Sequence, residues 1–289
     1  MRILDVPKKF MPKMEVVYPP HQNDKPMIEE RFYNYIINNT GLNSNLIYIP
    51  IFWTQYLINQ NYGSDIQELS KFINLINEKY KNDKFFTVVQ YDGGTLVPIN
   101  NSKIFACSGS FSSEFGKNSI YIPIPLLCEK HDYKKILRKK YLASFVGSLE
   151  THNLRKKMYD HYSSNKNFIF RYNLKYFKTY RFKRITKKSF FALCPRGYGP
   201  ASFRFYESLE LGTIPVYLSN YHWLPFNNKI DWKKATIIIN ENDINQIENK
   251  LNKILESSAY DEMTEYISLI NEKFLNWNST IKQILNDIC

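Results

Sequence analysis

The sequence contains little cysteine and no long apolar run. Its four cysteines, among 289 residues, stand apart and form no Cys-x-x-Cys pair. Isolated cysteines favour a reducing compartment or buried thiols over a disulfide framework. No stretch approaches the roughly 20 apolar residues that a membrane helix needs, and the N-terminus lacks the apolar core of a secretory signal. We therefore expect a soluble protein, which is either cytoplasmic or trimmed of a targeting segment.

Patterns for metal binding and for repeats are also missing. The histidines show no metal-ligand spacing, and no Asp-x-Asp pair stands near the end of a predicted strand. Hydrophobic residues make up 44% of the chain and aromatic residues 16%, which is enough for a packed core. We expect a folded globular protein with no metal site.

Positive charge is abundant and unevenly distributed. The formal net charge is +12, and residues 130–188 contain 18 Lys and Arg against three Asp and Glu. Such a surface attracts anions, among them nucleic acid, an acidic membrane, a phosphorylated small molecule or an acidic glycan. A solvated lysine face explains the same residues equally well. No nucleic-acid-binding motif accompanies the charge, so we expect no nucleic-acid partner.

Apolar and amphipathic segments alternate along the first half of the chain. Strands are predicted at 46–52 and 85–91. Between them lies a predicted helix at 63–80, where Ser64 and Gln67 resemble a capping box. The order of strand, helix and strand indicates βαβ units and a parallel sheet.

The alternation restarts after a polar, basic segment at 123–141, which suits a linker. Further strands are predicted at 141–147, 168–170, 190–194, 214–218 and 235–239, and helices at 151–162, 202–211, 242–258 and from about 260 onward. The fold class is therefore α/β. We expect two halves, 1–130 and 131–289, with a cleft between them, and the last helix can cross back to the first half.

One loop concentrates glycine, proline and arginine. The strand "FFALC" runs into "PRGYGPAS", and a helical stretch "FRFYESLEL" follows before Gly212. Ligands of open α/β sheets bind outside the carboxyl ends of the strands. Ser202 suits the N-cap of the helix, whose free N–H groups and dipole favour an anion. With Arg196 and Arg204 nearby, the loop predicts a phosphate site.

Glu207 lies one turn inside that helix, on the face of Arg204. Its carboxylate could accept hydrogen bonds from a ribose beside the phosphates. Two alternatives stay open: a glycine-rich turn that binds no ligand, and a plain surface ion pair between Arg204 and Glu207.

The stretch "FALCPRGYGPASFRFYESLELGTIPVYLSNYHWLPFNNKIDWKKATI" resembles the signature region of the exostosin-like glycosyltransferases. The shared features are the Pro-Arg-Gly turn, Ser-Phe-Arg-Phe-x-Glu, the Pro-Val strand, Leu-Pro-Phe and Asp-Trp. The resemblance covers about residues 190–250, with weaker similarity in "YLASFVGSLETHNLRKKMY" and "VVQYDGG". It implies a GT-B fold of two Rossmann-like domains that face each other. It also implies sugar transfer with inversion and without an obligatory metal cofactor.

The resemblance also implies a donor site in the second half. The residues that we expect to bind the donor are Arg155, Arg196, Gly197, Tyr198, Ser202, Arg204 and Glu207. Three arginines and Ser202 would hold the diphosphate, Glu207 the ribose, and Tyr198 could stack on a base or a sugar. Arg155 could instead be one charge of a basic helix face.

The catalytic base should come from the first half. Asp92 is the first candidate, because it follows a predicted strand and precedes Gly93 and Gly94. An Asp at this position is also an ordinary turn residue. His21 and Glu29 are the reserve candidates.

These observations predict an inverting glycosyltransferase that uses a UDP-sugar donor and a glycan acceptor. A polyanion- or nucleic-acid-binding protein, and a relative that binds the donor without catalysis, are the alternatives. The Asn-, Ile- and Lys-rich composition is typical of a microbial or large-virus genome, which predicts a role in surface glycan biosynthesis.

Overall fold

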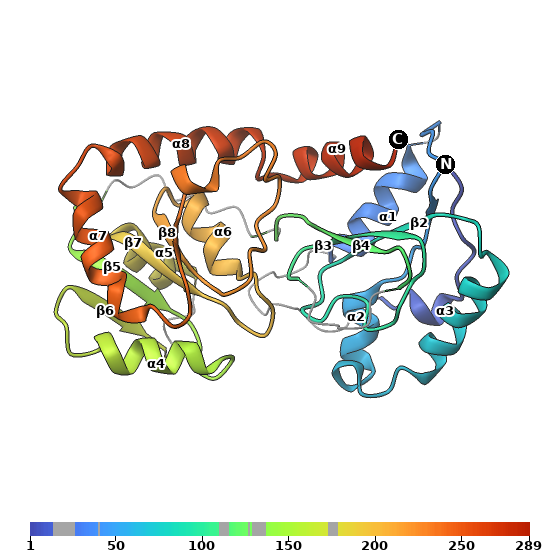
Figure 1. The fold of residues 1–289 in the computed structure, drawn as a ribbon, viewed down its shortest axis with the longest axis horizontal. Helices are drawn as coiled ribbons and strands as arrows, with labels where there is room; N and C mark the ends of the chain where they lie inside the picture. Colours follow the sequence, from blue (N-terminus) through green and yellow to red (C-terminus); the bar gives the residue numbers. More distant parts are fainter. Residues whose placement is uncertain (14–26, 40, 110–115, 127, 129–136, 173–178) are drawn as a thin grey trace. The chain divides into compact units, whose positions relative to one another are not determined.

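The fold was obtained as a computed structural model, in which residues 1–13, 27–39, 41–109, 116–126, 128, 137–172 and 179–289 are described (Figure 1). Contacts divide the chain into two compact units. Unit 1 comprises Met1–Pro125 together with Trp277–Cys289, and unit 2 comprises Leu126–Asn276. The helix near the C-terminus is therefore part of unit 1.

Unit 1 is built on a parallel sheet with the strand order β1-β2-β3-β4. The strands are β1 (Ile47–Tyr48), β2 (Phe85–Val89), β3 (Ser102–Ala106) and β4 (Ile120–Pro123). Every residue of β2 is buried, as expected for a central strand covered on both faces. Its carboxyl end leads into Gln90, Tyr91 and Asp92.

The helices of unit 1 pack apolar faces against this sheet. They are α1 (Ile28–Asn38), α2 (Trp53–Asn59), α3 (Gln67–Lys79) and α9 (Trp277–Ile288), with short 3-10 turns η1 (Lys8–Phe10) and η2 (Asn61–Gly63). In α3 the buried residues Leu69, Ile73 and Ile76 recur at helical spacing. The Ser44 hydroxyl donates to the Ile288 carbonyl at 2.5 Å, which joins α9 to the N-terminal part of the unit.

Unit 2 is built on a second parallel sheet with the order β6-β5-β7-β8-β9. The strands are β5 (Tyr141–Val146), β6 (Phe168–Arg171), β7 (Ser189–Pro195), β8 (Ile214–Leu218) and β9 (Ile237–Ile239). The chain leaves β5 toward β6 on one side and then returns to β7 on the other. The carboxyl ends of β5 and β7 thus form a topological switch point, which is where doubly wound sheets bind ligands.

Helices cover both faces of this sheet, with α4 and α8 on opposite sides in Figure 1. They are α4 (Asn153–Tyr162), α5 (Thr179–Lys187), α6 (Phe203–Glu210), α7 (Ile247–Leu255) and α8 (Ala259–Lys273), with 3-10 turns η4 (Trp232–Lys234) and η5 (Ile244–Gln246). The expected α/β architecture, with a parallel sheet in each half, is confirmed.

Some local predictions were wrong. The predicted strand at 46–52 pairs only over β1, and the helix α2, which the sequence did not suggest, begins directly after it. The capping box at Ser64 does not form, since the N-cap of α3 is Ile66 and makes no side-chain cap. The helix α5 was not expected either, because its basic residues obscure the apolar spacing. Asn-rich and Lys-rich segments carry weak periodicity, and tertiary packing decides them.

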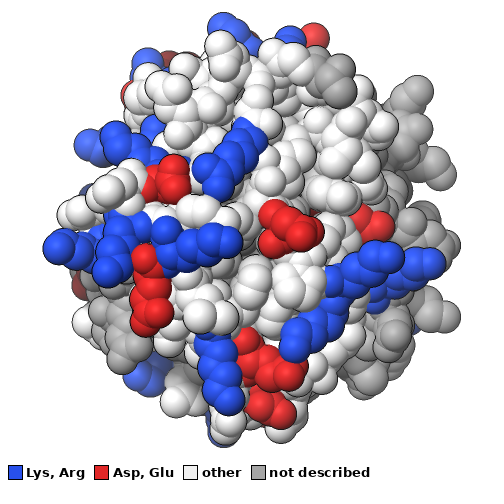
Figure 2. Space-filling view, turned by 90° about the vertical axis from the view of Figure 1, so that its right-hand side faces the viewer, with Lys and Arg blue, Asp and Glu red and all other residues white. Residues whose placement is uncertain are grey.

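Charges of both signs share the surface that Figure 2 displays. Lys and Arg side chains are interspersed there with Asp and Glu side chains. That face therefore lacks the single-sign field expected of a polyanion-binding surface.

Candidate functional site

The candidate site lies at the switch point of unit 2. The loop after β5 begins at Gly147 and the loop after β7 begins at Arg196, and these strands are hydrogen-bonded neighbours. The loop after β7 leads into α6, whose first-turn N–H groups lie at the same end of the sheet. Two loops and a helix N-terminus are therefore brought together, and the glycine-rich sequence predicted two of these parts, the loop after β7 and the helix.

Arg204, in the first turn of α6, reaches back to β5. Its Nε donates to the carbonyl of Val146 at 2.6 Å, and its guanidinium lies 4.6 Å from the centre of the Phe145 ring. Among the described residues, the buried Nη1 atom has no hydrogen-bond partner. Burial lowers the pKa of Arg204, although an arginine keeps its proton near neutral pH. Arg204 is thus a half-buried cation, and its buried Nη1 donor has no partner among the described residues.

Gly147 makes room for this guanidinium. A Cβ at position 147 would overlap Nη2 of Arg204 and lie 2.8 Å from its Cζ. The glycine is required by this close approach of the side chain. The sequence does not single out Gly147, because its contact comes from a residue far along the chain.

Arg155 ties the two loops together from α4. Its Nε donates to the carbonyl of Arg196 at 3.0 Å, its Nη1 to the carbonyl of Ser148 at 2.9 Å, and its Nη2 to the carbonyl of Pro195 at 3.5 Å. The side chain is buried. These contacts make Arg155 a positioning residue for the site, while its direct contact with a phosphate stays a prediction.

Thr151 is a site residue that the sequence did not suggest. Its buried Oγ1 has no hydrogen-bond partner within the described part of the chain. A Cβ at Gly197 would lie 3.8 Å from this oxygen and 3.2 Å from Nη2 of Arg155. Thr151, Arg155 and Gly197 therefore share one small space. The sequence signal that could have identified Thr151 is its hydroxyl in the loop between β5 and α4.

The predicted limits of α6 are confirmed. Ser202 is its N-cap residue, but the hydroxyl makes no capping hydrogen bond. Gly212 follows the C-cap with a φ of 66°, and its N–H donates to the carbonyl of Leu209 at 3.0 Å. The N–H of Thr213 donates to the carbonyl of Ser208 at 2.9 Å, which completes a Schellman motif.

Glu207 is buried in the second turn of α6. Burial lowers the pKa of Arg204, and the charges of Cys194 and Glu207 act against that effect. The spacing of three residues along α6 puts Arg204 and Glu207 on one face of the helix, and the role of Glu207 toward a ribose stays a prediction.

Arg196 points toward the loops that follow β8 and β9. Its Nη1 lies 3.7 Å from Oε1 of Glu241, and its Nη2 donates to the carbonyl of Tyr198 at 3.2 Å. Its guanidinium also lies 5.2 Å from the centre of the Tyr221 ring. Arg196 therefore has a carboxylate neighbour, and its role toward a diphosphate stays a prediction. Tyr198 is 65% exposed.

His152, the N-cap of α4, lies at the edge of this group. Its Nδ1 accepts the N–H of Leu154 at 3.2 Å. Burial lowers the pKa of His152, and the charge of Arg196 adds to this effect. Both effects disfavour the charged imidazolium form of His152.

The three base candidates differ in accessibility. Asp92 is half-buried in the turn beyond the carboxyl end of β2. Glu29, on α1, is fully buried, and its Oε1 accepts the N–H and hydroxyl of Thr54 at 3.1 and 2.6 Å and the N–H of Gln90 at 2.9 Å. Burial raises the pKa of Glu29. His21 lies outside the described residues.

Neither a metal-binding cluster nor a membrane-spanning helix is found among the described residues. No group of three or more His, Cys, Asp and Glu side chains is placed there to hold a metal ion. Within the same residues, no helix combines the length and the apolar composition that crossing a membrane requires.

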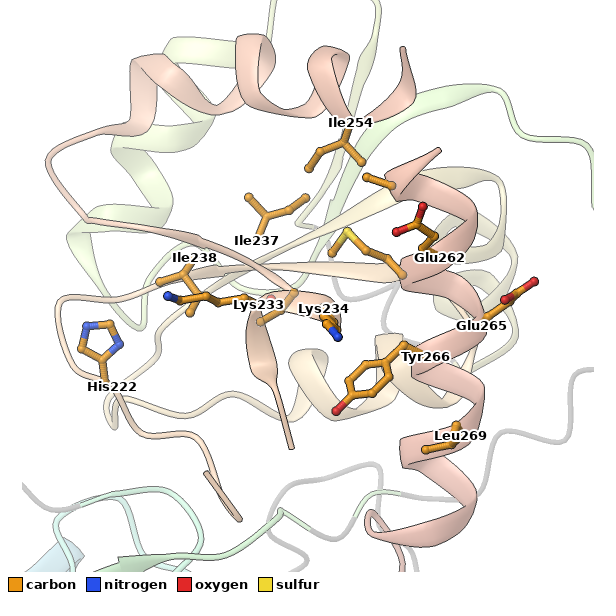
Figure 3. A pocket seen from close by; sticks show the side chains of 13 residues that line it. His222, Lys233, Lys234, Ile237, Ile238, Ile254, Glu262, Glu265, Tyr266 and Leu269 are labelled. Atoms are coloured by element: carbon orange, nitrogen blue, oxygen red, sulfur yellow. The ribbon is translucent and has the colours of Figure 1, made fainter. Parts of the chain in front are cut away.

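A groove of about 950 Å³ follows the edge strand β9 (Figure 3). Tyr266 projects from α8 toward it, and Glu265 of the same helix also lines it. Its lining includes Ile237 and Ile238 of the strand and Thr236, which precedes the strand. None of the predicted donor-binding residues lines this groove, so it is separate from the switch point.

Comparison with known proteins identifies the relatives of this chain. The sequence profile described as the Exostosin GT47 domain matches residues 44–257. Exostosin-1 of Drosophila melanogaster is 47% identical over 68 residues, which are 24% of this chain and 9% of that protein. The Exostosin-1 homolog of Caenorhabditis elegans is 32% identical over 106 residues, which are 33% of this chain and 28% of that protein.

These matches cover well under a third of the relatives' own length. Among solved structures, the pneumococcal O-GlcNAc transferase GtfA in complex with UDP and GlcNAc shows a TM-score of 0.42 and 10% identity. That likeness covers 90% of this chain and 58% of GtfA, and it is too weak to bear on function.

Proposed function

This chain belongs to the exostosin GT47 domain family, and on that premise we propose that it is a glycosyltransferase, with a nucleotide-diphosphate sugar bound in unit 2. The observation that carries the proposal is the buried Nη1 atom of the half-buried Arg204, which lacks a partner among the described residues. An unpaired donor on a buried cation is costly in free energy. A bound diphosphate removes that cost, because its oxygens accept charge-assisted hydrogen bonds.

The surroundings of Arg204 support the same ligand. The Thr151 hydroxyl is a second buried group without a partner in the described residues. The N-terminus of α6 adds the positive end of the helix dipole. Glu207, one turn farther along α6, is the group that we propose for the ribose hydroxyls. We propose UDP as the nucleotide.

The proposed reaction is transfer with inversion. The acceptor hydroxyl oxygen attacks C1 of the donor sugar, the bond from C1 to the phosphate oxygen breaks, and the electron pair leaves with the nucleoside diphosphate. Arg204 and the α6 N-terminus stabilise the charge that grows on the leaving group. Asp92 of unit 1 is the proposed base that takes the hydroxyl proton.

We also propose that transfer needs no divalent metal. In this site an arginine and a helix terminus can oppose the diphosphate charge, which is the work that a metal ion does in other transferases. Full activity in the presence of EDTA is the expected result, and restoration of lost activity by Mg²⁺ or Mn²⁺ would contradict it.

A thermal-shift panel tests the donor site. UDP, GDP, ADP and CMP are added to the purified chain, since a ligand of the folded state raises Tm according to its affinity. We expect one nucleoside diphosphate to raise Tm in the wild type and to have little effect on Arg204→Gln. Arg138→Gln, at an exposed arginine, is the matched control and should respond like the wild type.

Two results would contradict the proposal. One is the absence of a shift with every nucleotide together with salt-sensitive binding of DNA or RNA, which would favour a polyanion-binding protein. The other is nucleotide binding without any hydrolysis or transfer of a UDP-sugar, which would identify a non-catalytic relative. Loss of donor hydrolysis in Glu207→Ala would support catalysis.

A further inference from the structure

Three successive residues of η2 in unit 1 form a left-handed turn. The φ angles of Asn61, Tyr62 and Gly63 are 49°, 55° and 84°. Glycine adopts this conformation freely and asparagine tolerates it, whereas a bulky residue is opposed by its own Cβ. Tyr62 is therefore held in a backbone conformation that its side chain disfavours.

Packing does not offset this strain. The Tyr62 side chain is 66% exposed, which makes it more exposed than Tyr172 at 49% or Tyr221 at 47%. Asparagine or glycine at position 62 would allow the same turn at lower cost. A strained residue that contributes little to the core indicates a role other than folding.

The neighbouring loop holds the turn in place. The Tyr91 hydroxyl donates to the carbonyl of Tyr62 at 2.9 Å. Leu96, which also has a positive φ of 55°, fills the space beside two glycines. A Cβ at Gly63 would overlap its Cδ1, and a Cβ at Gly93 would lie 2.6 Å from its Cδ2. The two loops thus pack together as one piece through Leu96 and this hydrogen bond.

Asp92 belongs to this piece. It stands between Tyr91, whose hydroxyl holds the Tyr62 carbonyl, and Gly93, which packs against Leu96, and burial together with the charge of Asp92 raises the pKa of Tyr91. The loop follows the carboxyl end of β2, the edge at which parallel sheets bind ligands. An exposed aromatic ring and a carboxylate are therefore presented together at the ligand-binding edge of unit 1.

We infer that Tyr62 and Asp92 form a carbohydrate subsite, in which a pyranose ring of a glycan stacks on the Tyr62 side chain. The apolar C–H face of the sugar covers the ring, and its hydroxyl groups donate to the Asp92 carboxylate. This inference rests on the proposed function only in that the bound sugar is the acceptor. The subsite itself requires no donor.

The test is binding of the labelled full chain to a microarray of neutral and acidic oligosaccharides, without nucleotide. The wild type should bind at least one glycan class, and Tyr62→Phe should retain that binding. Tyr62→Asn should bind it roughly tenfold more weakly, because the stacking ring is lost. The same variant should melt at a higher temperature, since asparagine suits the left-handed turn.

Tyr172→Ala is the control for loss of an exposed tyrosine elsewhere and should bind like the wild type. Unchanged binding by Tyr62→Asn, or a wild type that binds no glycan on the array, would overturn the inference. These outcomes are independent of the nucleotide panel. Failure of the UDP response would contradict the proposed donor site and leave this subsite standing.

Discussion

Arg204 lies against Gly147 so closely that a Cβ at position 147 would overlap its guanidinium. The Nε of Arg204 meanwhile donates to the carbonyl of Val146, the residue before that glycine. The end of β5 and the first turn of α6 are thus joined through one side chain. This contact positions the Nη1 of Arg204, which has no partner in the described part of the chain, and is the basis of the proposed diphosphate site.

Gly147→Ala should weaken nucleotide binding more than it weakens the fold. The added Cβ displaces the end of a flexible side chain, which costs little stability, but it moves the guanidinium out of place. We expect the Kd for the preferred nucleoside diphosphate to rise roughly tenfold or more, which corresponds to about 1.4 kcal/mol. Isothermal titration calorimetry measures this change. A variant that keeps wild-type affinity would show that Arg204 does not bind the ligand.

Arg155→Lys should destabilise unit 2 and loosen the site. Lysine cannot replace the planar guanidinium, whose three nitrogens donate to the carbonyls of Ser148, Pro195 and Arg196. We expect a loss of about 2–3 kcal/mol in the free energy of unfolding. Urea denaturation measures it, with Arg138→Lys at an exposed arginine as the control. A loss of nucleotide affinity without any loss of stability would instead favour direct contact of Arg155 with the phosphate.

Glu29→Gln should change how stability depends on pH. Burial raises the pKa of Glu29 in the folded state above its ordinary value of 4.5. The stability linked to its protonated form is fully present below about pH 4.5 and is lost as pH rises through the folded pKa. The uncharged glutamine lacks this loss, so the variant should gain stability relative to the wild type as the pH rises above 4.5.

Urea denaturation at several pH values tests this trend, and Glu256→Gln, at an exposed carboxylate, controls for the loss of one charge. A difference between wild type and Glu29→Gln that stays constant with pH would contradict it.

Gly116→Ala should destabilise unit 1 strongly. A Cβ at this position would overlap the carbonyl of Ile99, which is backbone and cannot move aside. We expect a loss of about 3 kcal/mol, as in other overpacked sites. Gly41→Ala is the matched control, since its Cβ meets nothing within 4 Å and only its φ of 98° opposes alanine. Equal losses in the two variants would show that the overlap is relieved by backbone movement.

Sequence patterns located much of the fold and part of the site. The strand–loop–helix–strand unit from β7 to β8 was predicted closely, because each of its boundaries depends on residues within a few positions. Ser202 and Gly212 are examples, since capping and left-handed turns are local properties. By contrast, α2 and α5 were missed, because packing stabilises short helices of weak periodicity.

The sequence by itself determined where the glycine-rich loop stands, which strand precedes it and which helix follows. Only the tertiary structure decided what the side chains do. Arg155 donates to carbonyls 40 or more residues away, and Arg204 reaches a carbonyl 58 residues away. Glu29 accepts hydrogen bonds from Thr54 and Gln90, which lie 25 and 61 residues farther along. Such contacts depend on how distant segments pack, and no local pattern encodes them.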